Sequence, residues 1–180
     1  SNEMFYNENL LVRTDMMRRG ISKDLAKIAC GVFWLHVDGT AKHPPKGSAY
    51  NQGEIHAIQS LVPRLLRALA QRKMSEATLG IVTPYREQTN RLQRWVSKEY
   101  GDGDRIVVGT AHTFQGNERD VMVFSPVLAP GLKESSLDWL HRTENLLNVS
   151  VSRARNTLIV VGHWDYCKGL PADSKYRRLS

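Results

Sequence analysis

Cysteine is scarce in this sequence, which contains two cysteines, Cys30 and Cys167, among 180 residues. They form no Cys-x-x-Cys pair and no paired histidines accompany them, so their spacing favours neither a metal site nor a disulfide framework. Such sparing use of cysteine is typical of proteins in reducing compartments. We therefore expect a cytoplasmic or nucleoid-associated protein.

Long hydrophobic runs are also missing. No apolar run reaches the roughly 18 residues that would span a bilayer, and the first residues lack the basic and apolar regions of a signal peptide. We expect a soluble protein with no membrane partner. Ser1-Asn2 is typical of the residues that protease cleavage of a tag leaves behind, so residues 3–180 are expected to form one compact domain.

Negative charge is in the minority, because 25 Lys and Arg residues outnumber 18 Asp and Glu residues and give a net charge of +7. A positive field attracts nucleic acids and the phosphates of nucleotides. Charge alone does not separate a nucleic-acid-binding protein from other basic soluble proteins. The motifs along the chain must decide between them.

Short apolar runs separated by helical patterns organise the chain. Runs rich in β-branched residues predict strands at 32–37, 79–83, 106–108, 121–124 and 158–161. Continuous apolar strands that alternate with helices indicate an α/β fold, with a parallel sheet covered by helices on both faces. Ligands of such folds gather at the carboxyl ends of the strands. We find no internal repeat.

A polar stretch over 38–50, broken by prolines, predicts a loop before the first long helix. The helix is indicated by apolar residues at helical spacing, namely Ile55, Ile58, Val62, Leu65, Leu66 and Leu69. Asn51 and Glu54 are placed as the N-cap and N3 residues of a capping box. Pro63 is expected to bend this helix.

The first segment that could form a binding site is 80–88, where a predicted strand runs into a predicted helix. Thr83 and Pro84 supply an N-cap and an N1 proline for a helix whose apolar face holds Leu92, Trp95 and Val96. Free N–H groups at such a helix start can receive a phosphate. The alternative is a capped strand–helix junction in which Tyr85 packs on the sheet edge.

The second segment is the polar stretch after Val108, which lies between two predicted strands. It is too long for a hairpin, and it is rich in donors and acceptors, including His112, Gln115, Gly116 and Glu118. We expect a binding loop in which Thr110 donates to a phosphate oxygen, Gly116 lets the backbone approach a ligand and Glu118 accepts from a ribose hydroxyl. The alternative is a turn at Gly116 and a solvated Glu118–Arg119 pair.

The third segment, 145–155, is predicted as a helix over 146–154 that leads into the last strand. Leu147, Val151 and Ala154 share one helical face, which is expected to be the core side. Arg153 lies off that face, and Arg155 projects in nearly the opposite direction from Arg153, so the two arginines have separate roles. The alternative is a solvated helix end favoured by the helix dipole.

Together and in this order, the three segments resemble motifs IV, V and VI of superfamily 1 helicases, in the branch that contains the nonsense-mediated-decay and Okazaki-flap helicases. The matching sequences are TPY at 83–85, FQGNERD at 114–120 and LNVSVSRAR at 147–155. The resemblance runs from Met4-Phe-Tyr-Asn7 to about Trp164. It implies a RecA-like fold of the P-loop NTPase type, with residues 3–180 as the second of two motor domains that clamp ATP and move along a single strand.

The resemblance also implies roles for individual residues at the nucleotide. Arg153 resembles the motif VI arginine that reaches the γ-phosphate and stabilises charge developing on the transferred group. Gly116 and Glu118 match the motif V residues beside the triphosphate and ribose. Tyr85 and Arg86 follow the motif IV strand and are assigned to the nucleotide as well. Gln115 would link the nucleotide to the nucleic acid.

On the nucleic-acid side, Thr110 matches a position that contacts a backbone phosphate, and His112 matches one that can stack on a base. Thr83 and Pro84 of motif IV are assigned to the nucleic acid too. Many relatives carry a second phosphate-contacting arginine four residues beyond the motif IV tyrosine. In this sequence that position is Thr89, which leaves Arg86 or Arg91 as candidate substitutes.

The sequence contains no G-x-x-x-x-G-K-[ST] motif and no Asp-Glu pair that ends an apolar strand. The ligands of Mg²⁺ are therefore expected on a first RecA-like domain of the same parent chain, and this chain alone is expected to be a monomer that does not hydrolyse ATP. The main alternative is a non-enzymatic RecA-like module that binds nucleic acid or acts as a scaffold. A metal-dependent nuclease, built on Asp102, Asp104, Glu118 and Asp120, is disfavoured because no Glu-x-Lys accompanies them on a strand.

Overall fold

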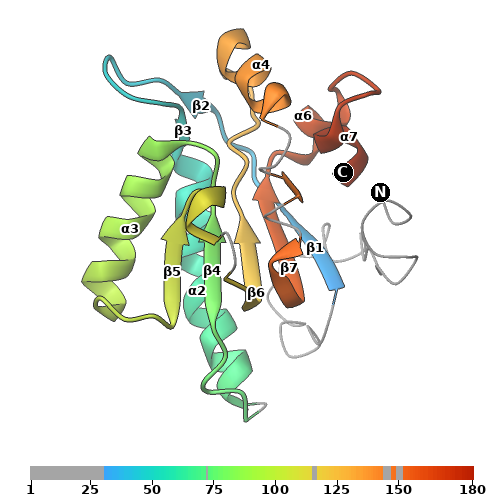
Figure 1. Ribbon diagram of the computed structural model, residues 1–180. Coiled ribbons are helices and arrows are strands. Elements are labelled where there is room, and N and C mark those ends of the chain that lie inside the picture. The colour runs from blue at the N-terminus through green and yellow to red at the C-terminus, as the bar shows by residue number, and fades with distance from the viewer. Residues whose placement is uncertain (1–30, 72, 115–116, 144–146, 149–151) are drawn as a thin grey trace.

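The computed structural model describes residues 31–180, apart from 72, 115–116, 144–146 and 149–151 (Figure 1). Within these residues a five-stranded parallel sheet has the order β1-β7-β6-β4-β5. The strands are β1 (Gly31–His36), β4 (Leu79–Val82), β5 (Ile106–Gly109), β6 (Arg119–Phe124) and β7 (Ala154–Gly162). The parallel α/β sheet predicted from the apolar runs is confirmed.

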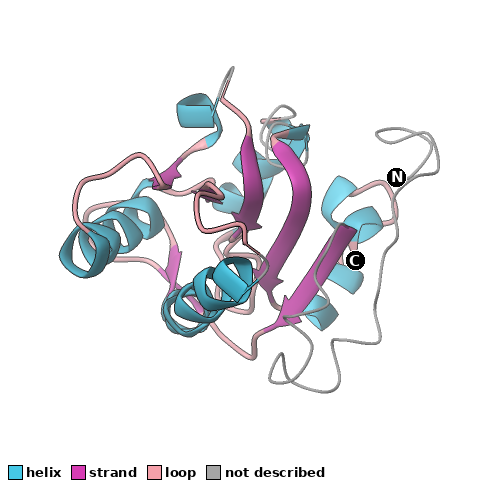
Figure 2. Ribbon diagram, turned by 90° about the horizontal axis from the view of Figure 1, so that it is seen from below, coloured by secondary structure: helices cyan, strands magenta, loops and turns pink. Residues whose placement is uncertain are grey.

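Helices cover both faces of this sheet (Figure 2). One face packs against the two long helices, α2 (Gln52–Gln71) and α3 (Arg86–Tyr100). The other face packs against shorter elements, which are the 3₁₀ helix η3 (Ala111–Phe114), α4 (Glu134–Arg142), α6 (Trp164–Lys168) and α7 (Lys175–Leu179). Successive residues of the strands alternate between the two cores, since neighbouring side chains of a strand point to opposite faces.

The start of α2 combines a local helix cap with a hydrogen bond to a residue distant in the sequence. The Asn51 Oδ1 atom accepts hydrogen bonds from the backbone N–H groups of Gly53 at 2.9 Å and Glu54 at 3.3 Å, so the predicted N-cap is confirmed. The reciprocal half of the capping box is not formed, because the backbone N–H of Asn51 donates to Gln88 Oε1 at 2.9 Å. The helix runs on through Pro63 as one element.

Several boundaries differ from the sequence-based expectation, and β6 and β7 begin earlier than predicted. The loop predicted over 38–50 contains β2 (Ala41–Lys42), which pairs antiparallel with β3 (Tyr50–Asn51). The predicted N-cap Thr83 is wrong, since the backbone N–H of Thr83 donates to Gly109 O at 3.1 Å and prolongs the β4–β5 ladder. Helix α3 begins two residues after Pro84, with Tyr85 as its N-cap.

Of the segment predicted as a helix over 146–154, residues 147, 148 and 152 are helical, while residues 146 and 149–151 lie outside the described residues. Its last residue, Ala154, already belongs to β7, so the helix cannot extend that far. Leu147 is buried in the core, as predicted for the apolar side of the segment. Across the described part of the chain, no helix is both long and apolar enough to cross a membrane.

Candidate nucleotide and nucleic-acid sites

The predicted site residues that the structure describes lie at two opposite edges of the sheet. Because the five strands are parallel, all of their carboxyl ends meet at the edge marked by the arrowheads in Figure 1. The segment 110–118 leaves β5 at this carboxyl edge and enters β6 at the amino edge, so it crosses one face of the sheet. The two edges are roughly 20 Å apart, given a rise of about 3.3 Å per strand residue.

At the carboxyl edge, the structure brings Thr110 and His112 together. Thr110 follows β5 directly and is half-buried, while His112 is exposed on η3. The turn of η3 is anchored because Ala111 and Phe114 are buried in the core beneath it. These two of the four residues predicted to contact nucleic acid therefore lie at one surface, above a buried part of η3.

The motif IV residues lie at the same carboxyl edge, but most of them are buried. Thr83 is fully buried, and Pro84 is buried beside it. Tyr85 is 3% exposed, and its hydroxyl donates to the backbone oxygen of Ser136 at 3.0 Å. Burial raises the pKa of Tyr85. Only Arg86, the first residue of α3, is exposed.

These positions bear on the assigned roles. Thr83 and Pro84 were predicted to contact nucleic acid. Both are buried, so in this conformation their side chains offer no surface to a single-stranded nucleic acid. Tyr85 and Arg86, assigned to the nucleotide, lie at the carboxyl edge with the predicted nucleic-acid residues and not with Glu118 and Arg153. The structure therefore does not bring the five assigned nucleotide residues together.

A buried polar network supports the carboxyl edge from below. Glu54 is fully buried, and its Oε2 atom accepts hydrogen bonds from Ser125 Oγ and from the backbone N–H of Val127 at 3.1 Å. Gln88 Nε2 donates to Ser125 Oγ at 2.9 Å, which ties the start of α3 to the end of β6. Burial raises the pKa of Glu54 to about 8, although the hydrogen bonds from Ser125, Val127 and Asn51 act in the opposite direction.

At the amino edge, Glu118 and two arginines lie where β6 and β7 begin. The backbone N–H of Arg119 donates to Arg153 O at 2.9 Å, so these two residues are neighbours across the strands. Arg155 Nε donates to Glu118 Oε2 at 3.2 Å, with both side chains about half exposed. Glu118 thus pairs with Arg155. The alternative, a solvated pair between Glu118 and its sequence neighbour Arg119, is not formed.

Arg153 differs from Arg155 in its surroundings. Arg153 is half-buried, and within the described residues its Nε atom is buried without a hydrogen-bond partner. Arg119 Nε is buried in the same unpaired state. A buried N–H group of an arginine normally finds an acceptor, and phosphate oxygens are well suited to that role. The residues at this edge therefore suit the phosphates of a nucleotide. Gln115 and Gly116 lie outside the described residues.

The structure also shows the surroundings of Thr89 and of Arg91, a candidate substitute for the missing motif IV arginine. Thr89 is 6% exposed, and its hydroxyl donates to Tyr85 O at 3.2 Å. Arg91 is engaged by its own domain, because its Nε donates to Glu87 at 2.7 Å and its guanidinium lies 3.8 Å from the centre of the Tyr50 ring. Arg119 was not recognised from the sequence, where its neighbour Glu118 offered an obvious partner.

The loop carboxylates do not gather into a metal site. Asp120 accepts hydrogen bonds from the backbone N–H and the hydroxyl of Thr78, both at 2.8 Å, which lower its pKa. Asp102 accepts from Ser97 Oγ, and Glu118 pairs with Arg155. In the described ranges, no group of three or more His, Cys, Asp or Glu residues could hold a metal ion.

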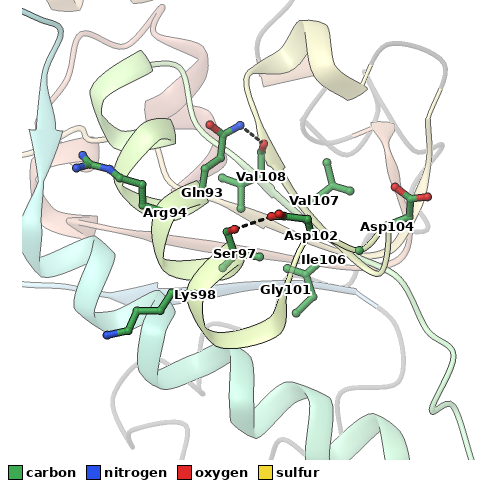
Figure 3. A pocket seen from close by; sticks show the side chains of 12 residues that line it. Gln93, Arg94, Ser97, Lys98, Gly101, Asp102, Asp104, Ile106, Val107 and Val108 are labelled. Carbon is green, nitrogen blue, oxygen red and sulfur yellow. Dashed lines mark hydrogen bonds between the residues drawn. The ribbon is translucent and has the colours of Figure 1, made fainter.

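A groove between α3 and the outer edge of β5 lies apart from these sites (Figure 3). It has a volume of about 700 Å³, and its wall is partly closed by Gln93, whose Nε2 donates to Val108 O at 2.9 Å. Ser97 and Asp102 line it with their mutual hydrogen bond. None of the predicted site residues lines this groove, so we do not assign it to the nucleotide or the nucleic acid.

A parallel five-stranded sheet with helices on both faces defines the chain as an α/β domain of the RecA-like class. Comparison with known proteins gives the family. Residues 1–165 match the family described as AAA domain. The chain belongs to this family and, with the relatives it matches, to the superfamily 1 helicases of the branch predicted from motifs IV, V and VI.

The relatives are much longer proteins. The chain is 31% identical over 123 residues to Helicase sen1 of Schizosaccharomyces pombe, which covers 67% of this chain and 7% of that protein. It is 32% identical over 117 residues to DNA polymerase alpha-associated DNA helicase A of Saccharomyces cerevisiae, covering 65% and 16% of the two chains. It is 28% identical over 152 residues to Helicase SEN1 of the same yeast, covering 83% and 7%. The chain therefore spans less than a fifth of each relative.

Proposed function

We propose that this chain is the second RecA-like motor domain of an ATP-dependent nucleic-acid helicase. It would work beside a first RecA-like domain in the same polypeptide, which supplies the phosphate-binding loop. The observation that carries this proposal is the state of Arg153, whose buried Nε lacks a hydrogen-bond partner within the described residues, while Arg155 is paired with Glu118. An arginine whose Nε lacks an acceptor within the described residues is suited to an acceptor that comes from outside.

Arg153 acts as the arginine finger in this proposal. During hydrolysis, negative charge spreads over the transferred phosphoryl group, and a guanidinium placed beside it stabilises the transition state more than the ground state. Its planar set of donors suits two phosphate oxygens at once. Arg153 directly precedes β7 and is half-buried, so part of its side-chain freedom is already lost before the nucleotide arrives.

The remaining nucleotide contacts would come from the segment between β5 and β6. Glu118 has an exposed carboxylate that can accept from a ribose hydroxyl, while its pairing with Arg155 fixes its direction. Gln115 and Gly116 are assigned here on the helicase resemblance alone. Mg²⁺ would supply charge neutralisation at the β- and γ-phosphates, and its ligands are expected on the first domain.

The segment 110–118 also offers a physical link between the two sites. It carries Thr110 and His112 at the carboxyl edge and Glu118 at the amino edge. A nucleotide that moves Glu118 would also move Thr110 and His112, which are proposed to contact the nucleic acid. We therefore propose that Thr110, His112 and the exposed Arg86 contact single-stranded nucleic acid. Arg86 was assigned to the nucleotide from the sequence, but it lies at the carboxyl edge with Thr110 and His112.

ATP turnover in two forms of the protein tests this proposal against a non-enzymatic RecA-like module. The 180-residue chain alone is expected to show no ATP hydrolysis, because the phosphate-binding loop is missing from its sequence. The full-length protein is expected to hydrolyse ATP, with stimulation by single-stranded nucleic acid. Turnover by the 180-residue chain alone, or none in the full-length protein with a single strand present, would contradict the proposal.

A further inference from the structure

Trp139 stands out on the surface of α4. Three large hydrophobic side chains in the described part of the chain are exposed, Met74, Tyr100 and Trp139, and Trp139 is the most exposed at 46%. The helix is attached to the core by other residues, since Leu140 is 1% exposed and belongs to the buried cluster on that face. Leu140, and not Trp139, anchors the helix in this buried cluster.

The ring of Trp139 is nevertheless held firmly. It lies against Tyr85, with ring centroids 5.6 Å apart and planes at 42°. Tyr85 is itself fixed, because it is 3% exposed and its hydroxyl donates to Ser136 O within α4. Aromatic pairs of this kind gain energy beyond simple burial. Trp139 thus presents a supported aromatic surface to the solvent.

Two basic residues lie at the two ends of the helix that carries this surface. Lys133 precedes α4, and Arg142 lies three residues after Trp139, so Arg142 projects from the same side of the helix. Both side chains are exposed. The acidic residues of the helix, Glu134 and Asp138, are five and one positions before Trp139, and they project from other sides. Of the charged residues of α4, Arg142 is therefore the one that shares the side of the indole.

The same surface belongs to the carboxyl edge of the sheet. Figure 1 shows α4 beyond the carboxyl ends of the strands. Thr83 is hydrogen-bonded to Gly109, the residue before Thr110, and Tyr85, which contacts Trp139, follows two residues later. A continuous set of contacts therefore connects Thr110 to Trp139 along one edge.

We propose that Trp139 is a stacking platform for an unpaired base of a single-stranded nucleic acid, and that the strand continues from Thr110 and His112 across this edge to α4. This assignment rests on the proposed helicase function. Stacking of a base on an aromatic ring tolerates any sequence, because every base has a π-face. Lys133, Arg142 and Arg86 would accompany the strand by neutralising its phosphates.

Equilibrium binding of a fluorescent single-stranded oligonucleotide to the full-length protein, without nucleotide, tests the assignment. Trp139→Ala is expected to weaken binding roughly 5- to 100-fold, the range for one lost base stack. Trp139→Phe should retain most of the affinity, since a phenyl ring still stacks. Tyr100→Ala is the matched control, because Tyr100 is an exposed aromatic residue at the other end of α3, and it should leave the affinity unchanged. Repeating the titration with DNA and RNA strands shows which the protein prefers.

Three results would overturn the assignment. If Trp139→Ala binds as the wild type does while a Thr110→Ala, His112→Ala double variant binds weakly, Trp139 has no contact and the proposed function stands. If the wild type binds no single strand, the proposed function fails and the assignment fails with it. If acrylamide quenches the emission of the wild type and of Trp139→Phe equally, with no strand present, another part of the protein covers Trp139.

Discussion

The buried carboxyl of Glu54 makes the stability of this domain depend on pH in a predictable direction. In the unfolded chain Glu54 loses its proton near its ordinary pKa of 4.5, whereas burial in the folded domain raises its pKa to about 8. Both states hold the proton at low pH, so no penalty exists there. As pH rises from about 5 to 8, the unfolded state is favoured, and the free energy of unfolding falls. Each pKa unit corresponds to about 1.4 kcal/mol, so the total effect is at most about 5 kcal/mol.

Urea denaturation of the wild type and of Glu54→Gln at pH 5, 6, 7 and 8 measures this effect. The amide cannot ionise, so the difference in the free energy of unfolding between the two proteins should shift in favour of Glu54→Gln as pH rises. This comparison cancels the contributions of the other titratable groups, which are the same in both proteins. Glu99→Gln, at an exposed position on α3, is the control and should follow the wild type. A difference between wild type and Glu54→Gln that stays constant from pH 5 to 8 would refute the reasoning.

Two further predictions concern the two edges of the sheet. Asp120→Asn should lower the free energy of unfolding by about 1 kcal/mol at pH 7, because the hydrogen bonds from Thr78 lose their charged acceptor. Since those bonds lower the pKa of Asp120, chemical denaturation should show the difference shrinking as pH falls below its ordinary value of 3.8. In the full-length protein, Thr110→Ala combined with His112→Ala should weaken single-strand binding by roughly 1–3 kcal/mol and leave ATP affinity nearly unchanged. Loss of ATP affinity with intact strand binding would reverse the assignment of the loop.

The sheet could be predicted from the sequence because its strands are continuous apolar runs. The runs at 79–82, 106–108 and 121–124 are almost completely buried, and burial on both faces removes the need for a polar alternation. The start of α3 could not be predicted in the same way. Thr83-Pro84 has the local chemistry of a helix start, but the hydrogen bond from Thr83 to Gly109 continues the strand. A partner distant in sequence decided between two reasonable local structures.

Glu54 shows the same limit at the candidate site. Its spacing from Asn51 predicts a capping box, and half of that motif is present. The carboxylate itself is taken by Ser125 and Val127, which lie 71 and 73 residues further along the chain. No pattern within the helix indicates these partners. Likewise, Glu118 could be expected to pair with Arg119, but the neighbouring strand brings Arg155 to it.

The central claim is that Arg153 acts on ATP held by another domain, and the turnover number of the full-length protein at saturating ATP and single strand tests it most directly. Arg153→Ala is expected to reduce kcat by about 10³-fold or more, and Arg153→Lys to restore little, because a point charge cannot replace the planar guanidinium. Strand affinity without nucleotide should be unchanged. Arg94→Ala, which removes an exposed arginine on α3, should keep the wild-type kcat. A folded Arg153→Ala variant that hydrolyses ATP at the wild-type rate would contradict the account.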